Sequence, residues 1–60
     1  SISLEAPFWA ELRAIARLKS MPINALVAEI DAKRGMDSGL ASAIRVYVLA
    51  SLKDRLPRSE

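Results

Sequence analysis

The 60-residue sequence contains no cysteine and no histidine, and it has only three aromatic residues and two glycines. Without cysteine, no disulfide or catalytic thiol is available, and the two absences together remove nearly every zinc-binding arrangement. The lack of cysteine is compatible with a reducing cytoplasm, where we expect the protein to reside. No histidine can activate a serine, and no glycine-rich loop is present to hold a nucleotide, so we expect neither an enzyme nor a bound cofactor or metal.

Long hydrophobic runs and a strong excess of one charge are also missing. Arg45 and Lys53 interrupt the most apolar stretch, so we expect no membrane span. Nine basic and seven acidic residues leave a net charge of +2. Binding to nucleic acid would therefore depend on the placement of a few positive groups and not on a large overall field.

Hydrophobic residues are abundant for so short a chain, at 52% of the sequence. A monomer of this size buries only about 60% of the surface that its unfolded chain exposes, and it has no disulfide or metal to reinforce it. We therefore expect one domain over residues 1–60 that is stabilised by association with a second copy.

The first five residues, Ser1, Ile2, Ser3, Leu4 and Glu5, alternate between polar and apolar, which predicts a short strand over about residues 1–5. A lone strand leaves its backbone groups without partners, and nothing later in the chain reads as a second strand. An identical strand from another subunit would supply the partner. The sequence thus predicts an intertwined homodimer joined by an antiparallel ribbon.

The rest of the chain predicts helices, so the expected fold class is mostly α with one short strand. Proline and glycine divide this part into three helices, over about residues 7–19, 23–34 and 39–56. Pro7 suits a first helical turn, Pro22 breaks the pattern, and Gly35 follows the second helix. Asp37 or Ser38 is expected to cap the third helix.

Apolar residues surround much of the third predicted helix, which indicates that it is covered on more than one side. In so short a chain, we expect the second covering surface to come from the partner subunit. Arg45 lies among these apolar residues and is expected to pair with Asp31 or Asp37. The residues expected at the dimer interface are Ile2, Leu4, Phe8, Trp9, Ile30, Ile44, Tyr47 and Val48.

The order and spacing of these segments resemble the ribbon-helix-helix superfamily of bacterial DNA-binding proteins, in a small subfamily with an added third helix. The likeness covers nearly all 60 residues and rests on Ser1-Ile2-Ser3-Leu4-Glu5, Pro7-Phe8-Trp9, Leu26-Val27-Ala28-Glu29-Ile30-Asp31 and Leu40-Ala41-Ser42-Ala43-Ile44-Arg45-Val46-Tyr47-Val48-Leu49. The resemblance implies an intertwined dimer whose paired strands enter the major groove of double-stranded DNA, while the N-termini of the second helices hold phosphates. The implied function is a sequence-specific transcription regulator, either a repressor or an antitoxin-type autoregulator.

The family's groove-facing positions fall on Ser1, Ser3 and Glu5, because alternation turns Ile2 and Leu4 toward the helices. These three residues are the expected contacts to DNA bases. They differ from the basic or amide side chains that the family's strands typically use to contact bases. Serine discriminates poorly among bases, and a carboxylate repels phosphate. The alternative is that they form only the polar face of a solvated ribbon.

For DNA phosphates, the expected contacts are the backbone N–H groups of Ile23 and Asn24, at the positive end of the second helix. Pro22 stands where relatives often carry a hydroxyl. Asn24 could replace that donor, or it could only support the local turn. Arg13 and Arg17, followed by Lys19, could reach neighbouring phosphates, although such a row is also typical of a solvated helix face.

A second hypothesis keeps the same dimeric scaffold but gives it another function. In this alternative, the protein is a protein–protein interaction module with little or no DNA binding, and it binds a protein partner through the apolar surface of the third helix. The serines and Glu5 near the N-terminus favour it. Lysine, arginine, threonine or asparagine just upstream of Ser1 would favour DNA binding, whereas a neutral or acidic stretch would favour the protein-binding alternative.

Overall fold

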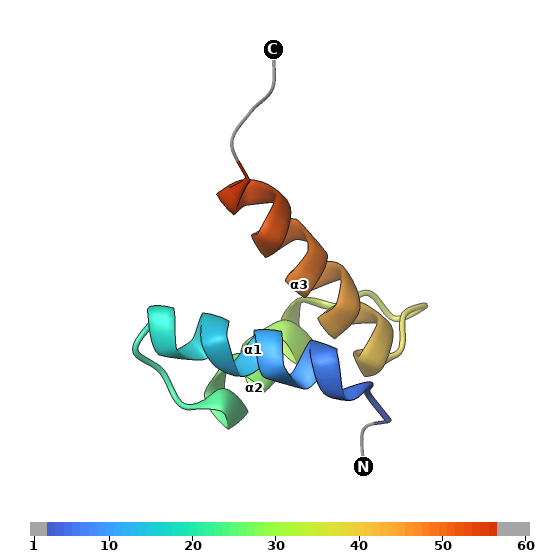
Figure 1. Cartoon of the computed structure of the whole chain (residues 1–60). Helices are drawn as coiled ribbons and strands as arrows, with labels where there is room; N and C mark the ends of the chain where they lie inside the picture. Colours follow the sequence, from blue (N-terminus) through green and yellow to red (C-terminus); the bar gives the residue numbers. More distant parts are fainter. Residues whose placement is uncertain (1–2, 57–60) are drawn as a thin grey trace.

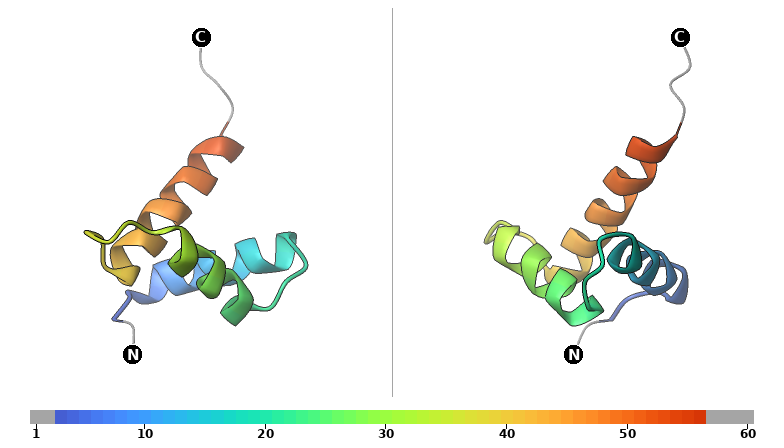
Figure 2. Two further views of the ribbon diagram at one scale, coloured as in Figure 1. Left: turned by 180° about the vertical axis from the view of Figure 1, so that it is seen from behind. Right: turned by 90° about the vertical axis from the view of Figure 1, so that its left-hand side faces the viewer.

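A computed structural model describes residues 3–56, which form three α-helices, α1 (Ala6–Leu18), α2 (Ile23–Lys33) and α3 (Leu40–Arg55) (Figure 1). Each helix begins and ends within one residue of its expected range. Helices α1 and α2 pack together, and the N-terminal half of α3 lies across both. The C-terminal half of α3 projects away from this body, as the two further views confirm (Figure 2).

The expected N-terminal strand is wrong for the residues that the structure describes. Residues 3–5 have no regular secondary structure, and all regular structure within residues 3–56 is helical. A strand exists only through hydrogen bonds to a neighbouring strand, which alternation in sequence cannot supply. Glu5 has an extended backbone (φ −64°, ψ 146°), and its carbonyl accepts hydrogen bonds from the N–H groups of Phe8 and Trp9, at 3.0 and 3.2 Å.

The segment before α1 therefore starts a helix instead of joining a ribbon. The fold class that included a strand and an intersubunit ribbon is corrected to an all-helical fold for these residues. Ser1 and Ile2 lie outside the described residues.

The core lies where the three helices cross. Its buried members come from all three helices and are Leu12, Ile15, Ala16, Leu26, Ile30, Ile44 and Val48. Their spacing of three or four residues within each helix places them on one face, so burying each helix against the other two removes these faces from water. Leu4, Phe8, Trp9 and Tyr47 pack against the edge of this core and remain partly exposed.

Helix α1 ends in a Schellman turn that places Ser20 in the left-handed region, at φ 55°. The N–H of Met21 donates to the carbonyl of Ala16 at 3.0 Å, and the N–H of Ser20 donates to Arg17 at 3.1 Å. This turn reverses the chain toward α2. Ser20 thus occupies the position that glycine usually takes at a helix end.

The boundary between α2 and α3 differs from the expectation. The N-cap of α3 is Gly39, and neither Asp37 nor Ser38 caps the helix. Gly35 does not adopt a positive φ, so it does not form the usual glycine motif after a helix. Arg34 instead leaves α2 in an extended conformation (φ −73°, ψ 151°).

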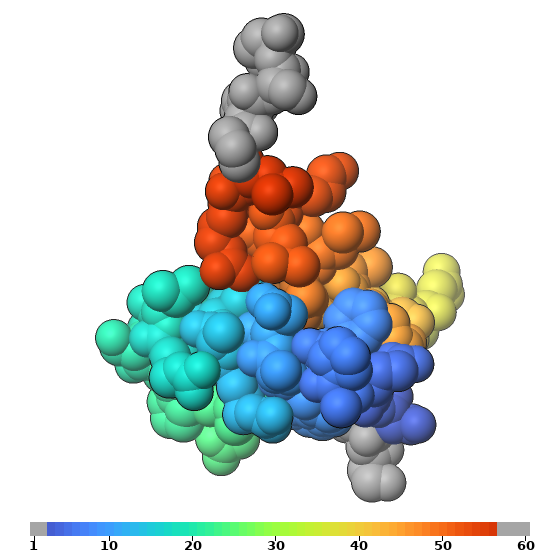
Figure 3. Space-filling view, viewed as in Figure 1, coloured from blue at the N-terminus to red at the C-terminus, as the bar shows by residue number. Residues whose placement is uncertain are grey.

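Helix α3 carries most of the exposed large apolar surface. Val46, Leu49, Leu52 and Leu56 remain exposed to 65, 56, 37 and 64%. Because they recur every three or four residues, they form one line along the helix, which we call the α3 stripe. The space-filling view shows α3 standing above the rest of the body (Figure 3). None of the helices in the described part of the chain is long and apolar enough to cross a membrane.

Candidate nucleic-acid interface

The start of α2 presents backbone donors to solvent. Pro22 is the N-cap, with φ −65° and ψ 151°, and its carbonyl accepts the N–H groups of Ala25 and Leu26, both at 3.1 Å. The N–H groups of Ile23 and Asn24 precede these bonds and have no acceptor within the helix. No side chain caps this end. The Ile23 side chain packs against the core, which holds the helix start in place, while Asn24 is exposed.

Two arginines on α1 are free to contact an external anion. Arg13 and Arg17 are exposed and form no ion pair within residues 3–56. Their spacing of four residues places both on the same side of α1. Lys19 differs from them, because its Nζ lies 3.4 Å from Glu29 and donates to the Tyr47 hydroxyl at 3.2 Å. Of the three cations expected to reach DNA phosphates from α1 and its end, only Arg13 and Arg17 are thus without a partner among the described residues.

The N-terminal segment places Ser3 and Glu5 at the surface. The carboxylate of Glu5 accepts a hydrogen bond from Nε of Arg45 at 3.0 Å and lies 2.9 Å from its Nη2. The Glu5 backbone N–H and the Arg45 guanidinium together hold the pKa of this carboxyl below its ordinary value. Arg45 offsets the charge that would otherwise repel phosphate.

The partner predicted for Arg45 from the sequence is therefore wrong, since Arg45 pairs with Glu5 and not with Asp31 or Asp37. Its guanidinium also lies 5.8 Å from the centre of the Phe8 ring. Forty positions separate Glu5 from Arg45, and no sequence pattern signals a contact at that distance. Only the packing of α1 against α3 brings them together.

The structure does not gather the expected DNA contacts into one cluster. Residues 3–5 lead into α1, whereas the start of α2 follows the turn after it, and both lie on the lower side of the view in Figure 1. The 13 residues of α1 span roughly 20 Å. Arg13 and Arg17 lie between these two segments in sequence, so the candidate groups are spaced along the length of α1. Ser1 lies outside the described residues.

The residues expected at the dimer interface divide into two groups. Ile30, Ile44 and Val48 are buried in the core of their own chain, whereas Leu4, Phe8, Trp9 and Tyr47 lie partly exposed at its edge. Ile2 lies outside the described residues. The α3 stripe lies on the third helix, whose apolar surface the sequence predicted would be covered by the partner subunit, although none of the four stripe residues is among the interface residues named from the sequence.

The comparison with known protein families decides the assignment. A family model described as a ribbon-helix-helix domain matches residues 1–52. The chain belongs to the ribbon-helix-helix domain family. Neither a curated protein nor a solved structure gave a significant match. The family consists of DNA-binding transcription regulators that usually dimerise and typically are not enzymes.

In this ribbon-helix-helix domain, the strand for which the family is named is not formed by residues 3–5 of the single chain. Within residues 3–56, no group of three or more acidic, histidine or cysteine side chains is placed to hold a metal ion. The groups available for recognition are backbone donors, arginines and small polar side chains. These groups are suited to binding phosphates and base edges.

Proposed function

We propose that this ribbon-helix-helix domain is a sequence-specific DNA-binding transcription regulator that acts in the cytoplasm as a homodimer, either as a repressor or as an antitoxin-type autoregulator. The observation that carries the proposal is the family match over residues 1–52. The exposed donors at the start of α2 and the unpaired arginines of α1 support it.

In the proposed complex, a DNA phosphate lies at the start of α2. The N–H groups of Ile23 and Asn24 donate to its oxygens, and the positive end of the helix dipole favours the negative charge. Arg13 and Arg17 contact neighbouring phosphates along α1. Ser3 and Glu5, with Ser1, supply the contacts to base edges, and Arg45 keeps Glu5 from repelling the backbone.

The proposed homodimer doubles these contacts, which are few in a single chain of net charge +2. Specific protein–DNA affinity depends strongly on the number of phosphates neutralised, so two copies bind far more tightly than one. The α3 stripe is the exposed apolar surface that such a dimer would cover.

Titrating DNA duplexes with the chain at several salt concentrations, followed by fluorescence anisotropy, tests the proposal. The double variant Arg13→Gln/Arg17→Gln should weaken binding and reduce the salt slope by about four per dimer, because each arginine releases about one counterion and the dimer carries two copies of both. Lys53→Gln/Arg55→Gln, which removes the same number of charges from α3, is the matched control and should leave the slope nearly unchanged. Equal losses of DNA affinity in the two variants would show that binding depends only on overall charge.

One observation favours a second candidate function, a protein–protein interaction module on the same scaffold. The α3 stripe is exposed enough to accept an apolar face of another protein. In that case, the chain would show no DNA binding even at low salt, and substitutions along α3 would abolish partner binding while Arg13→Gln would not.

A further inference from the structure

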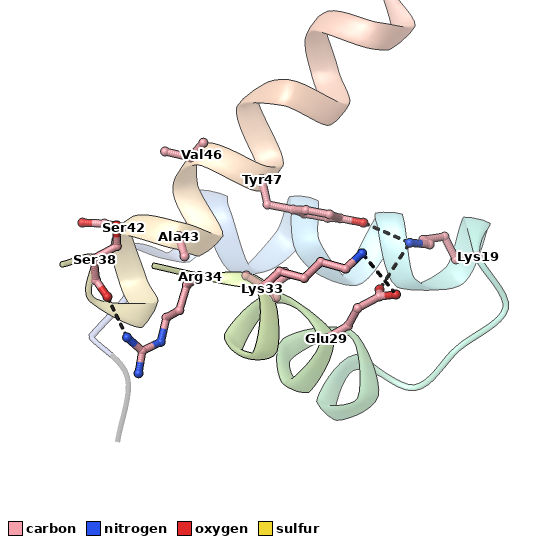
Figure 4. Close-up of a pocket in the computed structure, with 10 residues that line it drawn as sticks. Lys19, Glu29, Lys33, Arg34, Ser38, Ser42, Ala43, Val46 and Tyr47 are labelled. Carbon is pink, nitrogen blue, oxygen red and sulfur yellow. Dashed lines mark hydrogen bonds and ion pairs between the residues drawn. The ribbon is translucent and has the colours of Figure 1, made fainter. Parts of the chain in front are cut away.

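An open cleft lies between α2 and α3, away from the proposed DNA contacts at the start of α2. Its volume is about 360 Å³, within the range of small-molecule sites. Its walls are mostly apolar and include Ile30 on α2 and Ala43 and Val46 on α3. Figure 4 shows Tyr47 projecting from α3 across the space above α2, so its ring also borders the cleft.

The rim of the cleft carries more positive than negative charge. Lys19 and Lys33 share the single carboxylate of Glu29, at 3.4 Å from Oε1 and 3.9 Å from Oε2 (Figure 4). Arg34 also borders the cleft, but it is bonded to Asp31 and to the carbonyl of Ser38. One lysine charge is thus left without its own counterion at the rim. Since exposed ion pairs at these distances are weak, either lysine can turn to an incoming anion.

Tyr47 fixes the position of Lys19 beside the apolar wall. The Nζ of Lys19 donates to the Tyr47 hydroxyl at 3.2 Å and lies 5.8 Å from the ring centre. The Tyr47 ring packs against the core, which limits its movement. The hydrogen bond from Lys19 to Tyr47 raises the pKa of Lys19 above its ordinary value, which already leaves a lysine charged at neutral pH.

We propose that this cleft binds a small amphipathic anion, in which an aromatic or aliphatic body carries a carboxylate or similar group. The body lies against Val46 and the Tyr47 ring, and the anionic group lies between Lys19 and Lys33. We choose an anionic ligand because of charge complementarity. An anion can pair with the lysine charge that Glu29 does not neutralise, whereas an uncharged molecule cannot. This binding site goes beyond the proposed DNA-binding function and uses none of the residues proposed to contact DNA, and Val46 at its border also belongs to the α3 stripe.

Two fluorescent probes that differ mainly in charge test the proposal on the intact chain. Anilinonaphthalene sulfonate has an aromatic body and an anionic group, and phenylnaphthylamine has a similar body without the charge. The sulfonate should bind more tightly. Lys19→Gln or Lys33→Gln should each weaken it by about threefold to fivefold and leave the uncharged probe unchanged, as expected for a partly exposed charge contact. Lys53→Gln is the charge-matched control and should alter neither probe.

A second variant tests the location of the site by steric blocking, independently of charge. Ser42→Trp places a large side chain at the border of the cleft from an exposed position, so it should reduce binding of both probes without disturbing the core.

Three outcomes would overturn the proposal. Equal affinity for the two probes would show that the lysines at the rim do not favour an anionic ligand. Loss of sulfonate binding in Leu49→Gln, with full binding in Lys19→Gln, would place the probe on the part of the α3 stripe beyond Val46, outside the cleft. Sulfonate binding that disappears as the chain associates would show that a second copy fills the cleft.

Discussion

At the scale of single residues, the bond between Arg45 and Glu5 ties the segment before α1 to α3. Arg45 occupies a position where the helix is otherwise apolar, and its charge is accepted because Glu5 lies within reach. The sequence predicted a carboxylate partner for Arg45 but placed it in the wrong part of the chain. The contact also determines how Glu5 is presented to any ligand.

The first prediction concerns the pKa of Glu5. In Arg45→Met, this pKa should rise toward its ordinary value without reaching it, because the Glu5 backbone N–H still stabilises the carboxylate. Since the folded pKa lies below the unfolded one, ionised Glu5 adds stability at neutral pH. That contribution is lost as the pH falls through about 4.3 and then through the lowered value.

An NMR titration of the Glu5 carboxyl carbon in the native chain and in Arg45→Met measures this difference. Arg34→Met is the matched control: Arg34 is bonded to Asp31 and not to Glu5, so this variant should leave the Glu5 midpoint unchanged. An unchanged Glu5 midpoint in the variant would contradict the observed pairing.

The second prediction compares two leucines on α1. Leu12 is fully buried, whereas Leu18 is 69% exposed. Leu12→Ala should lower the free energy of unfolding by about 2–4 kcal/mol because it leaves a cavity in the core, whereas Leu18→Ala should cost about 0.5 kcal/mol or less. Urea denaturation followed by circular dichroism measures both. Similar losses at the two positions would mean that another copy covers Leu18.

At the scale of elements, the Schellman turn at the end of α1 contains the one strained backbone position among the described residues, Ser20. Ser20→Gly should stabilise the fold by about 0.5–1 kcal/mol, because the strain relieved exceeds the added freedom of the unfolded chain. The matched control is Ser42→Gly within α3, which should destabilise by about 0.5–1 kcal/mol. Thermal unfolding of the two variants should therefore shift in opposite directions.

The α3 stripe leads to a prediction about association. Leu49→Gln removes apolar surface from the middle of the stripe and leaves the core intact. The proposed dimer should therefore dissociate at a higher protein concentration, while the helix content of the chain is retained. Sedimentation equilibrium over a range of concentrations measures the effect. Lys53→Gln, on the same helix, is a polar control. If Leu49→Gln leaves the association constant unchanged, the dimer uses another surface.

The helices themselves were predictable because their signals are local. Pro7, Pro22 and Gly39 lie at or next to helix starts, and apolar spacing identified the faces that pack together. The prediction of a strand failed because strand pairing is not a local property, and residues 3–5 have no neighbouring strand among the residues that the structure describes. The prediction that Asp37 or Ser38 caps α3 was also wrong, since both residues lie before Gly39, which is the N-cap.

The candidate site was only partly predictable for the same reason. The positive end of α2 follows from the position of Pro22, and exposed arginines follow from helical spacing. The contacts of Glu5 with Arg45 and of Lys19 with Tyr47 depend on how α3 crosses the other helices, and 40 and 28 positions separate these pairs. The cleft between α2 and α3 arises from the same crossing.

At the scale of the whole molecule, the family match and the distribution of charge and apolar surface support the proposed function. In that proposal, a small helical regulator associates through apolar surface and contacts DNA along α1 and the start of α2. A net charge of +2 provides little overall attraction to DNA, so in the proposed complex the affinity depends on well-placed groups, and sequence preference should persist when salt is raised.

The most direct test of this account is an equilibrium binding titration by fluorescence anisotropy, with genomic fragments and scrambled duplexes of the same composition at low and moderate salt. The account predicts tight binding to one genomic sequence by two chains per site, with an affinity that falls as salt rises and a preference that remains. Absence of binding to any duplex at low salt would contradict it.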